Sequence, residues 1–177
     1  MALRTVLKFP DPRLRHQAEP VKVFDQTLTE LVNDMIETMI HDRGVGLAAT
    51  QIGVDLRVLV THCQPEEDAI VFINPIITEK EGKTIEYEGC LSVPEIFAKV
   101  ERAKKITVQF QDLEGNAKQM HLDGLMAQCL QHEIDHLDGK LFVDHLSPLK
   151  VRLLRNKLKK LEREFDKTVK HSDVQRG

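Results

Sequence analysis

The chain contains Gln131-His132-Glu133-Ile134-Asp135-His136 in its C-terminal third. Two histidines stand four residues apart, and a glutamate directly follows the first. On an α-helix, residues four apart lie on one face with their Cβ atoms ~6 Å apart, so both imidazoles can bind one metal ion. Glu133 is rotated by ~100° from His132 and can reach a water on such an ion without binding it. The spacing therefore predicts a central helix that carries a metal site for hydrolysis.

Length and composition favour a single compact domain around this helix. The chain has 177 residues, 41% of them hydrophobic, and a formal net charge of −3. This balance gives no reason to expect a membrane partner or direct, sequence-specific binding of nucleic acid. The first residues lack the features of a signal peptide, and no apolar run approaches the ~20 residues of a transmembrane helix. The three cysteines are too few for a disulfide framework, so we expect a cytoplasmic protein in which a cysteine can bind a metal.

Helical periodicity predicts a first helix from about Thr27 to Asp42. Thr27-Leu28-Thr29-Glu30 has the spacing of a capping box at its start, and Gly44 is expected to stop it. The helix of the histidines is predicted from about Gly124 to Leu137, with Asp123 as its N-cap. A further helix follows Pro148, with one apolar stripe and many basic residues on its other faces.

Segments rich in valine and isoleucine predict short strands. They are Arg57–Thr61, Ala69–Asn74, Lys105–Gln111 and Asn116–Leu122. The expected fold class is α+β: mixed or antiparallel short strands packed around the metal-binding helix, with an N-terminal and a C-terminal helix. Residues 1–170 are expected to form a single catalytic domain, and residues 171–177 a frayed tail.

A hydrolytic metal site needs three protein ligands and one open position. The third ligand can follow the histidines, as in HExxH-type metallo-endopeptidases. The residues available there are Asp144, His145, Glu162 and Glu164. It can also precede them, at Cys90 within Glu88-Gly89-Cys90-Leu91-Ser92. Because a free cysteine is most often a small buried hydrophobic residue, spacing alone leaves both alternatives open.

The segment Gly44-Val45-Gly46-Leu47-Ala48-Ala49-Thr50-Gln51 matches the short G-x-G-x-x-A fingerprint of dinucleotide-binding proteins. That fingerprint requires a strand before the glycines and a helix after them. Here an amphipathic helix precedes Gly44, and Gly53 interrupts the chain where the second helix would have to run. We therefore favour a loop whose glycines let a substrate backbone approach closely, with the Gln51 amide as a hydrogen-bond donor.

These three segments together, in this order, resemble peptide deformylase. That family carries Gly-x-Gly-x-Ala-Ala-x-Gln, Glu-Gly-Cys-x-Ser and Gln-His-Glu-x-Asp-His-Leu, which match residues 44–51, 88–92 and 131–137 without substitution. Residues 10–15 and 139–142 also look like the bacterial members. The resemblance covers about residues 3–165 and is far more specific than any one of its motifs.

The resemblance implies a metallo-amidase that removes the formyl group from the N-formyl-methionine of newly made proteins and releases formate. The metal ligands would be Cys90, His132 and His136. The ion would be Fe²⁺, one per chain, and Zn²⁺, Ni²⁺ or Co²⁺ can occupy the same kind of site. Glu133 would serve as general base and acid, and the Gln51 side chain and the Leu91 backbone N–H would stabilise the oxyanion.

The resemblance also implies where the formyl-methionyl peptide binds. The residues expected to bind it, through an apolar pocket and through their backbones, are Gly44, Val45, Gly46, Glu88, Gly89, Leu125 and Cys129. Ile96-Phe97 would shape the rim of the cleft or pack in the core, and we hypothesise a pair between Arg102 and Asp135. The basic last helix resembles the part by which some bacterial members dock on the ribosome, although a solvated helix face would look the same. An HExxH endopeptidase and a non-catalytic binding module are the alternatives.

Overall fold

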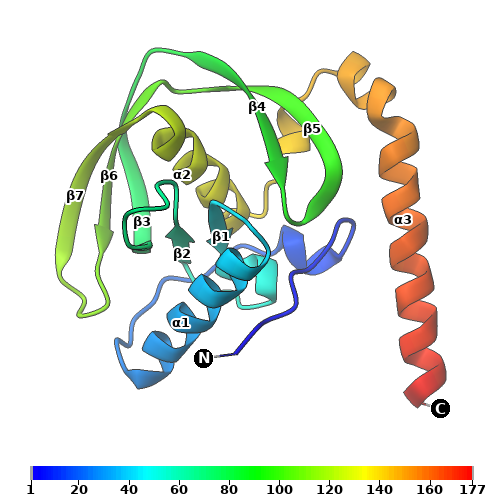
Figure 1. Ribbon diagram of the computed structural model, residues 1–177, viewed down its shortest axis with the longest axis horizontal. Helices are drawn as coiled ribbons and strands as arrows, with labels where there is room; N and C mark the ends of the chain where they lie inside the picture. The colour runs from blue at the N-terminus through cyan, green and yellow to red at the C-terminus, as the bar shows by residue number, and fades with distance from the viewer. Residues whose placement is uncertain (1, 177) are drawn as a thin grey trace.

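A computed structural model describes residues 2–176 of the chain (Figure 1). The elements in chain order are η1 (Pro12–Arg15), α1 (Gln26–His41), β1 (Gly46–Ala48), η2 (Ala49–Ile52), β2 (Val58–Thr61), β3 (Ile70–Glu81), β4 (Thr84–Cys90), β5 (Val93–Arg102), β6 (Lys105–Gln111), β7 (Ala117–Asp123), α2 (Gly124–Leu137), η3 (Phe142–His145) and α3 (Pro148–Arg176).

The strands form two antiparallel sheets. Five of them lie in the order β1-β2-β3-β6-β7, and β4 and β5 pair as a separate hairpin. In Figure 1 this hairpin arches over α2, while α1 lies on the other side of β1 and β2. The predicted α+β class, with short strands around a central helix, is confirmed.

The helix α2 has the predicted bounds and separates an apolar face from a polar one. Ala127, Leu130 and Leu137 are fully buried in a cluster with side chains of β2, β3 and β6. The polar face carries His132, Glu133 and His136, which are also buried. Since residues three and four apart share a helix face, one face of α2 anchors the helix and the other is free to form a site.

The start and the end of α1 differ from the prediction. Asp25, rather than Thr27, is the N-cap, and its carboxylate accepts a hydrogen bond from the Leu28 N–H at 3.0 Å. At the other end, Arg43 adopts the left-handed conformation with φ 59°, a role that the sequence suggested for Gly44. Both differences are shifts by one or two residues, which local sequence patterns do not resolve.

The four predicted strands are confirmed as β2, β3, β6 and β7, whereas β1, β4 and β5 were missed. A signal for β5 existed, because Ile96, Ala98, Val100 and Arg102 alternate as buried residues along it. Arg102 is the charged member of this alternation. Because a charged residue is not counted as apolar, the period of two along β5 was not recognised. In β4, Ile85 and Tyr87 alternate with Glu86 and Glu88, but the two apolar residues are exposed and Glu88 is the buried one, so the strand has no apolar face toward the core.

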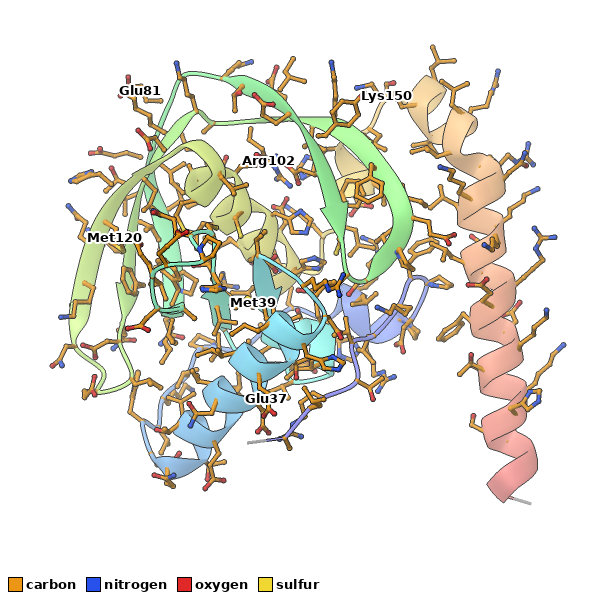
Figure 2. The ribbon with its side chains drawn as sticks, in the orientation of Figure 1. Glu37, Met39, Glu81, Arg102, Met120 and Lys150 are labelled. Atoms are coloured by element: carbon orange, nitrogen blue, oxygen red, sulfur yellow. The ribbon has the colours of Figure 1, made fainter. Side chains whose placement is uncertain are left out.

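The helix α3 lies at one side of the molecule, with Lys150 near its start (Figure 2). Of its predicted apolar stripe, Leu154, Leu158 and Leu161 pack on a cluster that includes Leu141 and Phe142. The backbone is helical to Arg176. The single domain of residues 1–170 and the frayed tail of residues 171–177 stay predictions.

We expect Leu161 to be the main anchor of α3. Leu161→Ala should lower the free energy of unfolding by ~2–4 kcal/mol, because its side chain is 5% exposed and its loss leaves a cavity. Leu153→Ala is the matched control on the same helix; this residue is 76% exposed, and the change should stay within ~0.5 kcal/mol. Urea unfolding of both variants measures the difference, and equal effects would contradict the packing of α3 on the core.

Candidate metal centre and active site

Three ligand atoms from two elements converge at the polar face of α2. The Cys90 Sγ lies 3.2 Å from the His136 Nε2, and the His136 Nε2 lies 3.3 Å from the His132 Nε2. All three ligand atoms lie within 4.8 Å of one another. Within residues 2–176 this is the one such group, so Asp144, His145, Glu162 and Glu164 are not part of a second ligand set.

The donor set fits a metal ion. Ligand atoms ~2.0–2.3 Å from one ion at tetrahedral angles lie ~3.3–3.8 Å from one another, close to the two observed separations. A thiolate and two imidazoles suit a divalent transition metal better than they suit calcium or magnesium. These three side chains therefore could hold one ion.

The two histidines of the cluster differ in the pKa of their rings. Burial lowers the pKa of His132, but its contacts with Cys90 and Glu88 outweigh burial and raise it well above the usual value. Burial and the neighbouring His132 together lower the pKa of His136 well below that value. The two shifts are opposite in sign, so positive charge on the pair is favoured at His132, beside Glu88, over His136.

A buried ion pair supports the first histidine. The Arg102 guanidinium donates to both carboxylate oxygens of Glu88, at 2.8 and 2.9 Å, and the Glu88 Oε1 lies 2.8 Å from the His132 Nδ1. Because the Nδ1 is engaged, the Nε2 faces the ligand cluster. Burial by itself would raise the pKa of Glu88. The hydrogen bonds and charges of Arg102 and His132 have the larger, opposite effect and bring the pKa down to about 2.

The hypothesised pair of Arg102 and Asp135 is present, with the Arg102 Nη1 2.6 Å from the Asp135 Oδ2. Asp135 also contacts the His145 ring at 2.8 Å. The carboxylate beside the ligand His132 is Glu88, while Asp135 contacts Arg102 and His145. Glu88 reaches His132 only because the fold brings β4 to α2.

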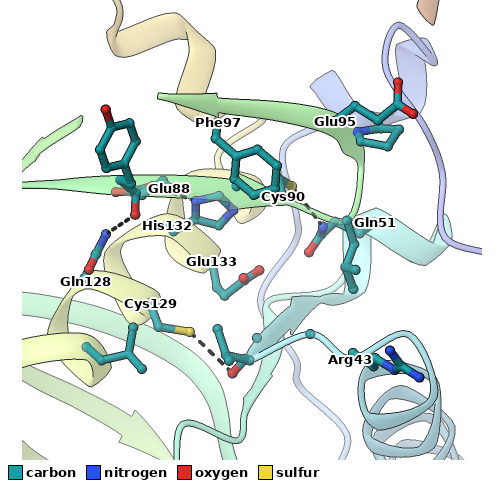
Figure 3. Close-up of a pocket in the computed structure, with 18 of the residues that line it drawn as sticks. Arg43, Gln51, Glu88, Cys90, Glu95, Phe97, Gln128, Cys129, His132 and Glu133 are labelled. Carbon is teal, nitrogen blue, oxygen red and sulfur yellow. Dashed lines mark hydrogen bonds and ion pairs between the residues drawn. The ribbon is translucent and has the colours of Figure 1, made fainter. Parts of the chain in front are cut away.

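Glu133 lies next to the ligand cluster without belonging to it. Its Oε2 is buried and has no hydrogen-bond partner among the described residues. Burial is the main cause that raises its pKa, to about 7. Figure 3 shows its side chain pointing into the space between His132 and Gln51. A carboxyl group with such a pKa is suited to accept and return a proton near neutrality.

Gly46 explains how β1 approaches this carboxylate. A Cβ at Gly46 would lie 2.7 Å from the Cys129 Sγ and 2.7 Å from the Glu133 Oε1. The second glycine of the Gly44–Gln51 segment is therefore required by close packing against α2. The Gln51 side chain also faces the cluster, with its Nε2 3.6 Å from the Cys90 Sγ.

A cavity of about 490 Å³ opens over these groups. It is lined by all of the residues predicted for the site except His136, which lies behind them and is 1% exposed. The Glu88 carboxylate is turned toward Arg102 and His132, a contact that the sequence did not indicate. The leucine and valine of the expected apolar pocket, Leu125 and Val45, are half exposed on its walls.

The rim of the cavity includes one residue of a pair that the sequence left open between rim and core, and one residue that sequence reasoning missed, Gln128. Of the pair Ile96-Phe97, Ile96 is buried in the core, while Phe97 is 65% exposed and covers Gly89. Gln128 also lines the cavity, and its side-chain amide donates to the Tyr87 carbonyl at 3.2 Å. The alternation of β5 would have placed Phe97 on the face opposite to Ile96, had that strand been recognised.

The fold and this site define a metal-dependent hydrolase of the HExxH type, with a cysteine from a separate hairpin in place of a downstream third ligand. The family model described as polypeptide deformylase matches residues 3–152. The chain belongs to the polypeptide deformylase family. The endopeptidase alternative finds no support.

Similar proteins include a peptide deformylase 2 from Xanthomonas campestris, 51% identical over 167 residues that cover 92% of this chain and 98% of the relative. A peptide deformylase from Chromobacterium violaceum is 48% identical over 165 residues, covering 93% and 99%. The crystal structure of a peptide deformylase from Legionella pneumophila matches with a TM-score of 0.87 and 49% identity, covering 93% of this chain and 98% of that one.

The ion pair of Glu88 yields a pH-dependent prediction for the metal-free protein. A carboxyl group whose folded pKa is about 2 stabilises the folded state above its unfolded value near 4.5, and loses that effect as the pH falls toward 2. Urea unfolding should therefore show a stability difference between wild type and Glu88→Gln that is largest above pH 5 and shrinks by about 3 kcal/mol toward pH 2. Glu86→Gln, an exposed neighbour on β4, should change stability by less than ~0.5 kcal/mol at any pH. A difference for Glu88→Gln that is flat with pH would contradict the ion pair.

Proposed function

We propose that this enzyme hydrolyses the N-formyl group of formyl-methionyl peptides and nascent chains and releases formate. The observation that carries the proposal is the cluster of Cys90, His132 and His136 beside the buried Glu133, whose Oε2 has no hydrogen-bond partner among the described residues. The family to which the chain belongs supports the choice of substrate.

A formamide is an amide, so its hydrolysis needs a strong nucleophile and a proton for the leaving nitrogen. An ion held by Cys90, His132 and His136 would supply Lewis-acid chemistry that makes a water nucleophilic near neutral pH. Glu133 takes a proton from the attacking water at its free Oε2 and returns it to the leaving nitrogen. One water is consumed, the C–N bond breaks, and formate and a free amine form.

The negative charge that develops on the formyl oxygen needs donors aimed at it. Gln51 and Leu91 line the cavity beside Cys90, and we assign this role to the Gln51 Nε2 and the Leu91 backbone N–H. One such preorganised donor is typically worth ~3 kcal/mol of the barrier. Both groups belong to segments held rigidly by the fold, which is what preorganisation requires.

The peptide would bind as an added strand. Within the described residues β1 is the edge strand of its sheet, and its free edge borders the cavity opposite Gly89. Backbone groups of Gly44, Val45, Gly46 and Gly89 would pair with the extended substrate. The methionine side chain would enter the apolar slot formed by Val45, Leu125, Cys129 and the aliphatic part of Glu88.

We infer Fe²⁺ as the resident ion, with Zn²⁺, Ni²⁺ or Co²⁺ as substitutes. A mixed thiolate and imidazole set is compatible with all four, so metal availability decides among them. Elemental analysis of anaerobically purified protein tests this inference. One iron per chain is expected.

We infer a cytoplasmic enzyme that meets its substrates at the ribosome. Among the described helices none has the length and apolarity needed to cross a membrane. The apolar side of α3 packs on the core, while Arg152, Arg155, Lys159 and Arg163 remain exposed. These cations are suited to bind ribosomal RNA phosphates.

The reaction is tested by formate release from a formyl-Met-Ala peptide. Anaerobically purified protein should release formate, and a chelator should abolish the release because the site loses its ion. Glu133→Gln should bind metal normally but lose ~10²–10⁴ in kcat, as expected for a lost general base. Near-normal turnover by Glu133→Gln would contradict the role of Glu133 as general base. Cleavage of internal peptide bonds would favour an endopeptidase.

Cys90→Ala serves as the contrasting variant, since it should lose metal retention as well as activity. Leu153→Ala, on the exposed side of α3, is the matched control and should release formate at the wild-type rate.

Ribosome docking is tested by co-sedimentation. Reversing Arg155, Lys159 and Arg163 to glutamate should abolish binding while leaving peptide turnover unchanged, because these side chains lie away from the cavity. Reversal of Lys104, Lys105 and Lys118, on and beside β6 and β7, is the control. Equal loss in both triple variants would indicate unspecific attraction of charge.

A further inference from the structure

We propose that Ser92 is a positioning residue for the oxyanion-stabilising amide of Gln51. Ser92 closes the turn between β4 and β5, directly after Leu91, and is fully buried. Its Oγ accepts a hydrogen bond from the Gln51 Nε2 at 3.1 Å. The inference rests on the proposed function, because it assigns Ser92 a role through the donor assigned there.

The contacts of Gln51 determine which way its amide points. The Gln51 Oε1 accepts the backbone N–H of Ala48 at 2.9 Å, so the nitrogen must face the opposite side. The Nε2 donates to the Ser92 Oγ at 3.1 Å and lies a longer 3.6 Å from the Cys90 Sγ, so the strong bond takes one of its two N–H groups. Ser92 thus occupies one donor and leaves the weakly bound one directed at the metal cluster. That second N–H is the one available to a developing oxyanion.

Without the Ser92 hydroxyl, the amide would lose this constraint. Ser92 is fully buried and Gln51 is 1% exposed, so loss of the hydroxyl removes the acceptor that fixes the orientation of the amide, and the amide is free to rotate. Rotation moves both N–H groups at once. A donor that is turned away from the oxyanion loses most of its catalytic value, because the benefit depends on geometry fixed before the reaction.

The N-terminal segment holds Gln51 and Ser92 in register. The Leu7 N–H donates to the Gln51 carbonyl at 2.7 Å, and two residues later the Phe9 N–H donates to the Ser92 carbonyl at 2.7 Å. In extended backbone, N–H groups two residues apart point to the same side. Residues 7–9 therefore link the backbone of Gln51 in η2 to the backbone of Ser92 in the β4–β5 turn, and so keep the Gln51 side chain within reach of the Ser92 hydroxyl.

The kinetic test is Ser92→Ala, alone and in a Gln51→Leu background. In the wild-type background kcat for formate release should fall ~10-fold with KM unchanged, since an orientation used mainly in the transition state is lost. In the Gln51→Leu background Ser92→Ala should have no further effect. Thr38→Ala removes an equally buried hydroxyl, which accepts the Arg4 N–H far from the cavity, and should leave kcat at the wild-type level.

Three kinetic outcomes would overturn the inference. They are a kcat within ~2-fold of wild type, an undiminished loss in the Gln51→Leu background, and a Gln51→Leu variant that is itself fully active. A merely structural role of Ser92 would lower kcat in both backgrounds.

A measurement without turnover separates this inference from the proposed function. In the ¹⁵N-labelled, zinc-loaded wild type, one Gln51 side-chain N–H should show the downfield shift and slow exchange of a buried hydrogen bond. Ser92→Ala should remove that signature and leave zinc affinity unchanged, whereas Thr38→Ala should retain it. A fast-exchanging Gln51 amide in wild type overturns the positioning role even if Ser92→Ala does not fold. Absence of formate release with this signature present would overturn only the proposed function.

Discussion

The buried ion pair between Glu88 and Arg102 is the interaction on which the rest of the site depends. It joins the β4–β5 hairpin to itself, and through His132 and Asp135 it joins the hairpin to α2. Charges are costly to bury unless every partner is in place, so this network admits few alternative arrangements of the two elements. Cys90 lies two residues after Glu88 on the same strand. The ion pair therefore brings the thiol to the two histidines.

The same constraint explains why two carboxylates in one small site behave in opposite ways. Glu88 is held ionised by a guanidinium and an imidazole, and its pKa is about 2. Glu133, also buried, lacks such partners, and its pKa is about 7. The first can orient a metal ligand at any physiological pH, whereas the second can exchange a proton there. Environment, and not residue type, divides the two roles.

Some of the molecule followed from local patterns, namely the bounds of α2 and the four strands of high β propensity. The set of site residues came instead from the resemblance of three motifs to deformylases. The hairpin β4–β5 did not follow from local patterns, because β4 is exposed and β5 buries an arginine in its apolar alternation. The N-cap of α1 also lies at Asp25 rather than Thr27, since both residue types can accept hydrogen bonds from the free N–H groups of a first turn.

The sequence by itself determined that α2 presents His132, Glu133 and His136 together, because helical geometry links residues four apart. It also contained the three motifs whose order is typical of deformylases. Only the tertiary structure decided that Glu88, and not Asp135, supports His132, and that Ser92 meets Gln51. These contacts join segments 41 and 44 residues apart in the chain. No local period encodes such a distance, so it is resolved only when burial forces each polar atom to find a partner.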